Sequence, residues 1–185
     1  MRFEPTPLEG VWTVETAPHG DARGRLTRLF CAADFAEGIG RELRFVQTNH
    51  TLTTQRGTVR GLHFQHPPHA EAKLIRCIRG RVWDVAVDLR RGSPTFGRWH
   101  AVELADDNER QILIPEGCAH GFQALSDDAQ LLYQHTAAYA PAHEAGVRHD
   151  DARLAIAWPL PVTLVSERDR VHPTLADLEH GVLTT

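Results

Sequence analysis

The sequence predicts an all-β fold of the sandwich or jelly-roll type, with only a few short helices. Short β-branched or apolar segments recur along the chain, and turn residues separate them at roughly the 8–12-residue intervals expected of all-β domains. Helix signals are few, and the stretch 82–89 alternates apolar and polar side chains, as a strand with two different faces does. Many short strands of this kind close into a jelly-roll barrel.

The strand-forming segments follow one another between residues 45 and 136. Arg79-Gly80 lies between two of them and predicts a tight hairpin. In the second of the two, Asp84 falls on one face while Val85 and Val87 fall on the other, so we expect one core face and one polar face that lines a cavity. The expected strands span residues 45–53, 58–65, 73–79, 82–89, 98–104, 111–114, 121–125 and 130–136.

The remaining segments are expected to be helical or irregular. A short helix is predicted at 32–37, because two glycines follow its alanine-rich run, and one more helical turn is predicted at 174–178. The stretch 141–161 is rich in Pro, Asp and Trp and is expected to be irregular. Residues 1–30 predict an N-terminal arm that could be exchanged with a partner subunit. No domain boundary is evident, so a single domain spanning 1–185 is expected.

Composition excludes several classes of function. A net charge of −4 without a basic stripe argues against nucleic-acid binding. No charged-then-apolar leader begins the chain, and no apolar run approaches the ~20 residues that span a bilayer. We therefore expect a cytoplasmic protein that does not enter a membrane.

The cysteines and most histidines carry no clear assignment. The 3 cysteines are odd in number and widely spaced, which argues against a disulfide framework. Cys118, beside His120, is either a nucleophile or a small buried residue, and burial is the commoner reading for cysteine. Six histidines beside prolines or charges read as loop and surface residues without a role: His66, His69, His143, His149, His172 and His180.

His63 is the candidate general base. It lies in an expected strand between two apolar residues, where an ordinary structural histidine is the alternative reading. A base at neutral pH needs a pKa near the operating pH, and histidine has one. It also needs a carboxylate to fix its tautomer and to stabilise its charged form. Asp84 and Asp169 are the two candidates for that carboxylate.

Lys73 and Tyr133 complete a set suited to proton transfer beside a carbonyl. If Lys73 points into a cavity, its ammonium can stabilise an enolate oxygen; the alternative is a solvated lysine at a strand end. Tyr133 is either a core tyrosine with a bonded hydroxyl or an acid that returns a proton from the opposite face. Together with His63 and its carboxylate, these residues indicate a carbohydrate-modifying enzyme that moves protons without a cofactor.

Metal and nucleotide cofactors have little support. Pro115-x-Gly117-x-x-His120 resembles the second half of the metal-binding cupin motif, but the His-x-His pair that such a site requires does not occur in the chain. His63 and His66 are three positions apart, which sends them to opposite faces of a strand. No Walker motif and no Rossmann fingerprint appears. Three arginines are either phosphate clamps or solvated surface residues: Arg23, Arg60 and Arg168.

Taken together, the motifs resemble the dTDP-4-dehydrorhamnose 3,5-epimerase family, a family of cupin-fold enzymes. Their order and spacing carry the resemblance through most of the chain. They are Gly20-Asp21-x-Arg23-Gly24, Gln47-x-Asn49-His50, Arg56-Gly57-x-x-Arg60-Gly61-Leu62-His63-Phe64-Gln65, Ala72-Lys73-Leu74, Asp84-Val85-Ala86-Val87-Asp88, Ser93-Pro94-Thr95-Phe96-Gly97, Pro115-Glu116-Gly117-x-Ala119-His120-Gly121-Phe122, Tyr133, Tyr139-x-Pro141, Trp158-Pro159 and Ser166-Glu167-Arg168-Asp169.

The resemblance implies a cupin-type jelly-roll homodimer that uses no metal and no organic cofactor. Its substrate would be a nucleotide-diphosphate sugar of the dTDP-4-dehydro-6-deoxyglucose type, inverted at C3, C5 or both. His63 would remove the proton, Asp169 would pair with it, Lys73 would steady the enolate, and Tyr133 would reprotonate. The implied binding residues are His120 at the sugar, Arg60 and Arg168 at the diphosphate, Gln47, Asn49 and Tyr139 at the nucleotide or sugar, and Arg23 from the partner subunit.

The chain departs from the family pattern beside the implied nucleotide site. Where an aromatic pair and a glutamate are usual, this chain has Arg25-Leu26-Thr27-Arg28, so Leu26 and Arg28 replace a stacking contact and a carboxylate. Glu71 and Gln134 replace a glutamine and a lysine. The alternatives are therefore a 3- or 5-epimerase on another nucleotide sugar, a sugar 3,4-ketoisomerase, and a non-catalytic sugar-nucleotide-binding or metal-binding cupin.

Overall fold

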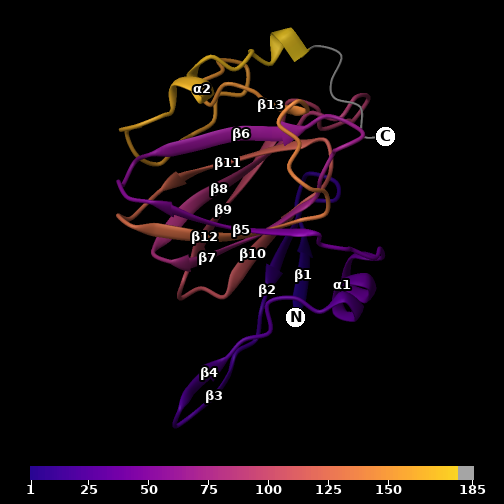
Figure 1. The fold of residues 1–185 in the computed structure, drawn as a ribbon, viewed down its shortest axis with the longest axis vertical. Helices are drawn as coiled ribbons and strands as arrows, with labels where there is room; N and C mark the ends of the chain where they lie inside the picture. The colour runs from indigo at the N-terminus through magenta and orange to yellow at the C-terminus, as the bar shows by residue number, and fades with distance from the viewer. Residues whose placement is uncertain (179–185) are drawn as a thin grey trace.

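Two antiparallel sheets face each other in a jelly-roll barrel, which confirms the predicted all-β class (Figure 1). The computed structural model describes residues 1–178. In order across the larger sheet, its strands are β1 (Arg2–Pro5), β2 (Trp12–Glu15), β10 (Arg110–Ile114), β7 (Lys73–Arg79), β12 (Ala129–His135) and β5 (Gln47–Thr53). The smaller sheet has β13 (Glu144–Gly146), β6 (Val59–Gln65), β11 (Cys118–Ala124), β8 (Arg81–Asp88) and β9 (Trp99–Ala105).

The expected strands are present, with ends that differ by up to three residues. β11 begins at Cys118 rather than at 121, because Cys118 already pairs with Asp88 of the neighbouring strand β8. Strand β13 lies inside the stretch that was expected to be irregular. It is three residues long and is held by its pairing with β6, so its own sequence carries too little alternation to reveal it.

Short helices lie at the margins of the barrel. They are α1 (Ala32–Ile39), α2 (Glu167–Arg170) and a 3₁₀ turn, Ala176–Leu178. The first was predicted to end at 37, yet Gly38 lies inside it, where a Cβ would fall 2.2 Å from the Phe3 ring. A glycine is therefore required there by close packing, and the helix ends at Gly40, whose φ of 74° is left-handed.

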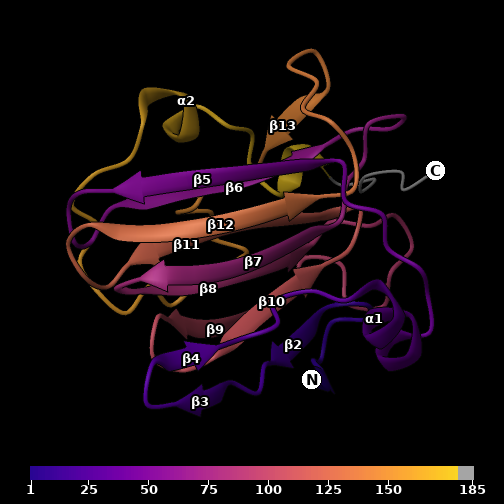
Figure 2. The same cartoon turned by 60° about the horizontal axis from the view of Figure 1, so that its bottom comes forward.

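The expected N-terminal arm, residues 1–30, has two structurally different parts. Strand β2 pairs with β1 and with β10, and its Val14 is fully buried, so the first fifteen residues belong to the chain's own sheet. What stands away from the body is the hairpin of β3 (His19–Asp21) and β4 (Gly24–Leu26) (Figure 1). Figure 2 brings the side that carries this hairpin forward.

One apolar cluster fills the space between the two sheets, and two more cover parts of their outer faces. One lies inside the barrel and includes Ile75 and Phe122. A second packs Leu154 from the C-terminal segment against Val85 and Val87, over the smaller sheet (Figure 1). This corrects the expectation for strand β8, because its polar face and its apolar face are both buried. A third cluster seats α1 on the larger sheet. None of the helices within residues 1–178 is long and apolar enough to cross a membrane.

Candidate functional site

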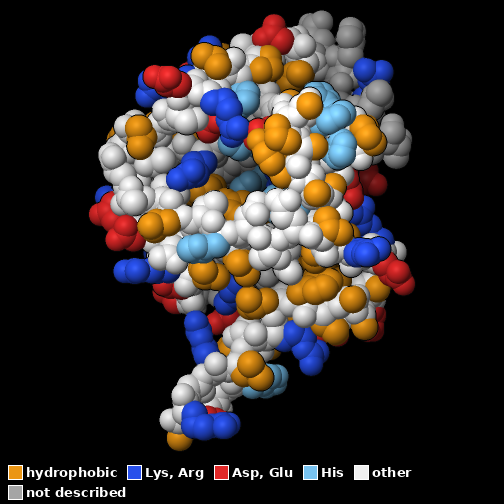
Figure 3. Space-filling model, viewed as in Figure 1, with side chains coloured by type: hydrophobic (Ala, Val, Ile, Leu, Met, Phe, Trp, Pro, Cys, Tyr) orange, Lys and Arg blue, Asp and Glu red, His pale blue; other side chains and the backbone are white. Residues whose placement is uncertain are grey.

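A cavity of about 630 Å³ lies between the two sheets and collects most of the candidate residues. The face seen in Figure 3 is hollowed, with histidine and basic side chains gathered at the hollow. The smaller sheet contributes Arg60, His63 and His120 to the lining, and the larger sheet contributes Lys73 and Tyr133. The other expected lining residues are Gln47, Asn49, Tyr139, Arg168 and Asp169.

His63 is paired with Asp169, one of its two predicted carboxylates. The Nε2 atom of His63 lies 2.8 Å from Oδ1 of Asp169, whose Oδ2 accepts the backbone N–H of Gly61 at 3.0 Å. Although burial acts to raise the pKa of Asp169, the hydrogen bonds from His63 and Gly61 hold it well below its usual range. An ionised carboxylate only accepts hydrogen bonds. The Nε2 of His63 therefore carries a proton, so Nδ1 is the ring nitrogen that can act as the base.

The local sequence explains how Asp169 reaches this position. It sits in the one-turn helix α2, which begins after Ser166. The Ser166 hydroxyl oxygen accepts the backbone N–H of Asp169 at 3.1 Å, as a helix N-cap does. This short helix sets the carboxylate against strand β6, although 106 residues separate the two partners in sequence.

Asp84, the other candidate carboxylate, pairs with His120 instead. Its two oxygens lie 3.0 and 2.9 Å from Nε2 of His120, and both residues are buried. His120 lies directly opposite His63 on the adjacent strand. Two imidazoles, each held by its own buried carboxylate, thus stand side by side on the smaller sheet.

Lys73 points into the protein and is not a solvated strand-end residue. Its side chain is only 8% exposed, with Nζ 3.0 Å from Oε1 of Glu71. The same nitrogen donates to the backbone carbonyl of His63 at 3.2 Å. The ammonium is therefore held between a buried carboxylate and the strand of the candidate base.

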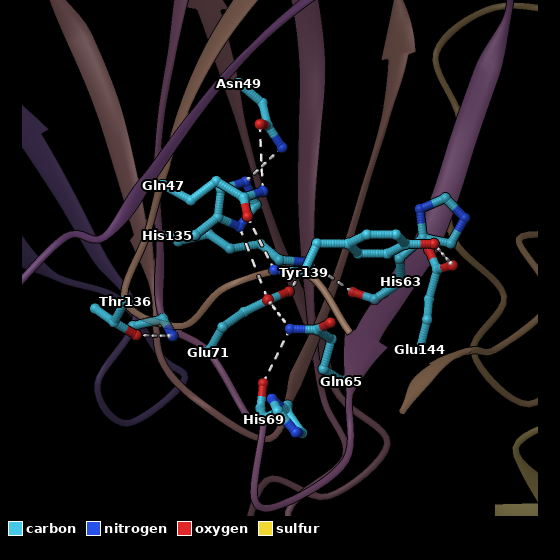
Figure 4. Close-up of polar contacts among 12 residues, drawn as sticks. Gln47, Asn49, His63, Gln65, His69, Glu71, His135, Thr136, Tyr139 and Glu144 are labelled. Carbon is cyan, nitrogen blue, oxygen red and sulfur yellow. Dashed lines mark hydrogen bonds and ion pairs between the residues drawn. The ribbon is translucent and has the colours of Figure 1, made fainter. Parts of the chain in front are cut away.

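Glu71 and His135 extend this arrangement, and sequence reasoning gave neither a site role (Figure 4). Glu71 accepts a short hydrogen bond from Gln65, and its Oε2 lies 3.9 Å from Nδ1 of His135. Burial, together with the nearby Lys73 and His120, lowers the pKa of His135 to about 4. His135 is therefore neutral, and because Asn49 donates to its Nε2 across 3.4 Å, its proton lies on Nδ1 and faces Glu71.

Tyr133 enters the cavity from the sheet opposite His63. It is 8% exposed, and its ring meets His120 edge-on at 5.7 Å. Burial and the negative charge of Asp84 raise the pKa of Tyr133 well above its usual range. The phenol therefore stays protonated at neutral pH and can act as a proton donor. His135 lies two residues further along the same strand, so period-two alternation from Tyr133 could have pointed to it.

The two arginines of the cavity lining, Arg60 and Arg168, are each held by a hydrogen bond to a neighbouring side chain. Glu144 accepts hydrogen bonds from the Tyr139 hydroxyl at 2.7 Å and from Arg168 at 2.8 Å. Arg60 donates to the Thr53 hydroxyl at 3.0 Å. Glu144 belongs to the unexpected strand β13, which is why the sequence gave no sign of it.

Several expected or unassigned residues lie elsewhere. Arg23 sits on the projecting hairpin, where its side chain is 90% exposed and paired with Asp21, and it does not line this cavity. Cys118 is buried, and burial raises the pKa of its thiol to about 12, which fits the structural reading and not a nucleophile. The surface assignment was wrong for His149, which is buried, and for His172, which is largely buried. His180 lies outside the described residues.

Comparison with known proteins identifies close relatives of this chain. The family model described as dTDP-4-dehydrorhamnose 3,5-epimerase matches residues 5–177. A dTDP-4-dehydrorhamnose 3,5-epimerase of Shigella flexneri is 44% identical over 91% of this chain and 93% of its own length. A dTDP-4-dehydrorhamnose 3-epimerase of Streptomyces niveus is also 44% identical, over 100% of this chain and 89% of its own.

The fold has an equally close match among solved structures. The crystal structure of a 4-keto-6-deoxy sugar epimerase from the novobiocin biosynthetic gene cluster of Streptomyces spheroides superimposes with a TM-score of 0.92. It is 44% identical in sequence, and the match covers 97% of this chain and 89% of that one.

Proposed function

This chain belongs to the dTDP-4-dehydrorhamnose 3,5-epimerase family, and from that premise we propose that its cavity epimerises a nucleotide-activated 4-keto-6-deoxysugar. It is an enzyme of the isomerase class. The relatives described above are named as epimerases and not as ketoisomerases or binding proteins. Both curated relatives act at C3, so inversion at C3 is the central step of the proposal, with C5 as the possible second centre.

One observation carries the mechanism: a base and an acid enter one cavity from opposite sheets. His63, with the lone pair on Nδ1, removes a proton from the carbon beside the C4 ketone. Tyr133, which keeps its proton at neutral pH, returns one to the opposite face of the same carbon. Two opposed groups are what inversion requires. Because C3 and C5 both flank the ketone, one site can serve either position.

Lys73 steadies the enolate that forms between these two steps. Glu71 and the His63 carbonyl engage its ammonium, which leaves a third N–H for the ketone oxygen. Since Glu71 balances the lysine's charge, the stabilisation comes chiefly from a directed hydrogen bond to the developing oxyanion.

The rest of the cavity would hold the substrate. Arginine offers a forked pair of donors that matches phosphate oxygens, so Arg60 and Arg168 are assigned to the diphosphate. His120, held by Asp84, would line the sugar. Gln47, Asn49 and Tyr139, which lie at the same cavity, would place the nucleotide or the sugar.

The proposed working form is a cytoplasmic homodimer without metal or organic cofactor. The hairpin of β3 and β4 supports an exchanged arm, because its Leu26 is 74% exposed on a segment that stands away from the body (Figure 1). Contact with a second subunit would remove this apolar side chain from water, which is favourable. Arg23, on the same hairpin, would then reach the partner's cavity.

The test is proton exchange in deuterated water. Incubation with dTDP-4-keto-6-deoxyglucose should introduce deuterium at C3, read by NMR, and deuterium at C5 as well would identify a double epimerase. His63→Ala should abolish exchange at every position while the fold survives. His50→Ala, which changes an exposed histidine on strand β5, is the matched control and should exchange normally. Full exchange in His63→Ala would refute the mechanism.

A further inference from the structure

A third group lies against the His63–Asp169 pair and has no part in the proposed reaction. His172 follows α2, and its ring meets the His63 ring edge-on at 5.5 Å. Its Nε2 atom lies 3.7 Å from Oδ1 of Asp169, beyond hydrogen-bonding distance. Nε2 is buried and has no hydrogen-bond partner among the described residues. A buried nitrogen without a hydrogen-bond partner lowers the stability of the fold, and a ligand bound to this nitrogen would remove that cost.

The three side chains form a set of metal-ligating atoms. One ligand atom from each of His63, Asp169 and His172 lies within 4.8 Å of the others, and no other group of three among the described residues does so. We propose that this cluster binds a divalent transition-metal ion of the Zn²⁺ type and that the bound ion inhibits the enzyme. The inhibition rests on the proposed function, whereas the binding does not.

The spacing suits such an ion after small movements. Zinc bonds to nitrogen and oxygen ligands are about 2.0–2.2 Å long, which sets tetrahedral ligand atoms roughly 3.3 Å apart. The two separations from Oδ1 of Asp169 are 2.8 Å to His63 and 3.7 Å to His172, one slightly short and the other slightly long. The cavity, where the His63 side chain is 25% exposed, admits water as a fourth ligand.

Charge and outer contacts also favour the site. Two imidazoles and a carboxylate are ligands that zinc, copper and nickel accept. Oδ2 of Asp169 is already fixed by the Gly61 N–H, which orients Oδ1 toward the two rings. The guanidinium of Arg168 lies 3.8 Å from Oδ1, but Glu144 balances that charge at 2.8 Å.

Binding would remove the base without changing the number of protons on it. A metal on Nε2 of His63 takes the electron pair there, so the single proton of the neutral ring moves to Nδ1. The lone pair that attacks the substrate is then gone. Zinc should therefore lower kcat, and removal of the zinc by a chelator should restore the activity fully.

Calorimetry on the metal-stripped full chain with zinc chloride provides the first measurement. One ion per chain should bind, and Co²⁺ in its place should give the visible absorption of a tetrahedral site. His172→Gln should retain metal-free activity, because His172 takes no part in the reaction, and should lose zinc affinity by more than about 10-fold, the smallest loss expected for an outer contact alone. His172→Asn repeats the test if the glutamine variant fails to fold.

The control is the His69–His143 pair, whose rings lie 4.5 Å apart and could bind zinc as a surface site. His143→Ala should leave both zinc binding and inhibition unchanged. The proposal is overturned if the parent chain binds no zinc, if His172→Gln binds it as tightly, or if His143→Ala abolishes binding. Calorimetry and the cobalt spectrum need no substrate, so they decide the metal site even if the epimerase assignment fails.

Discussion

At the scale of single residues, the buried ion pair of Glu71 and Lys73 is the most consequential contact outside the base and acid. Both side chains are less than one-tenth exposed, and 3.0 Å separates Oε1 from Nζ. Breaking a buried pair from one side leaves a charge without its partner, which costs about 3 kcal/mol or more. Each partner is therefore needed once the other is present, and Glu71 also fixes the position of the lysine.

Removing Glu71 should therefore destabilise the fold. We expect Glu71→Ala to lower the free energy of unfolding by about 3 kcal/mol, measured by urea denaturation. Glu71→Gln is the matched control, because its amide oxygen can still accept a hydrogen bond from Lys73, and it should lose clearly less. If both variants lost the same free energy of unfolding, a neutral acceptor at residue 71 would contribute nothing to holding Lys73, and this explanation would be wrong.

His135 should make stability depend on pH. Its pKa falls from 6.5 to about 4 on folding, chiefly because it is buried. Between these values the unfolded chain binds a proton that the folded chain refuses, so stability is complete above pH 6.5 and decreases as the pH falls toward 4. The full shift corresponds to about 3 kcal/mol. The denaturant concentration at the unfolding midpoint should decrease as the pH is lowered from 6.5 to 4 for the parent chain. For His135→Gln it should decrease much less. An unchanged slope in that variant would assign the effect to another group.

At the scale of elements, alternation along strands explains which site residues could be predicted. His63, Lys73 and Tyr133 lie on strands β6, β7 and β12, whose polar positions inside apolar runs mark them in the sequence. The residues alone left Asp169 as one of two candidate partners for His63, and only the family resemblance favoured it. The choice between Asp169 and Asp84 depends on how α2 docks on β6, a contact between segments far apart in the chain.

Other site residues depend on elements that leave little trace in the sequence. Glu71 precedes strand β7 in a loop, where no periodicity shows which way a side chain points. Glu144 is placed by a strand of three residues that exists because it pairs with β6. His172 lies in the turn after α2, so its burial against His63 arises from the same docking. Long-range packing, rather than local pattern, decides all three positions.

At the scale of the whole molecule, the projecting hairpin separates one expected binding residue from the cavity it would serve. Arg23 is 90% exposed and pairs with Asp21 of its own hairpin, while the other expected residues line a single cavity. In a symmetric dimer the same contact occurs twice, so each hairpin would reach the other subunit's cavity. The active unit would then contain residues from two chains.

Mixing two inactive variants tests this arrangement directly. Arg23→Ala and His63→Ala should each lose most activity as pure dimers. In a mixed dimer, the subunit with intact His63 receives the intact Arg23 of its partner, so one cavity becomes complete while the other lacks both groups.

Random exchange of equal amounts makes about half of the dimers mixed, and the activity should recover to about a quarter of the parent value. Cross-linking or light scattering confirms that subunits have exchanged. Without any recovery after such exchange, Arg23 would act within its own chain, and the hairpin would not be an exchanged arm.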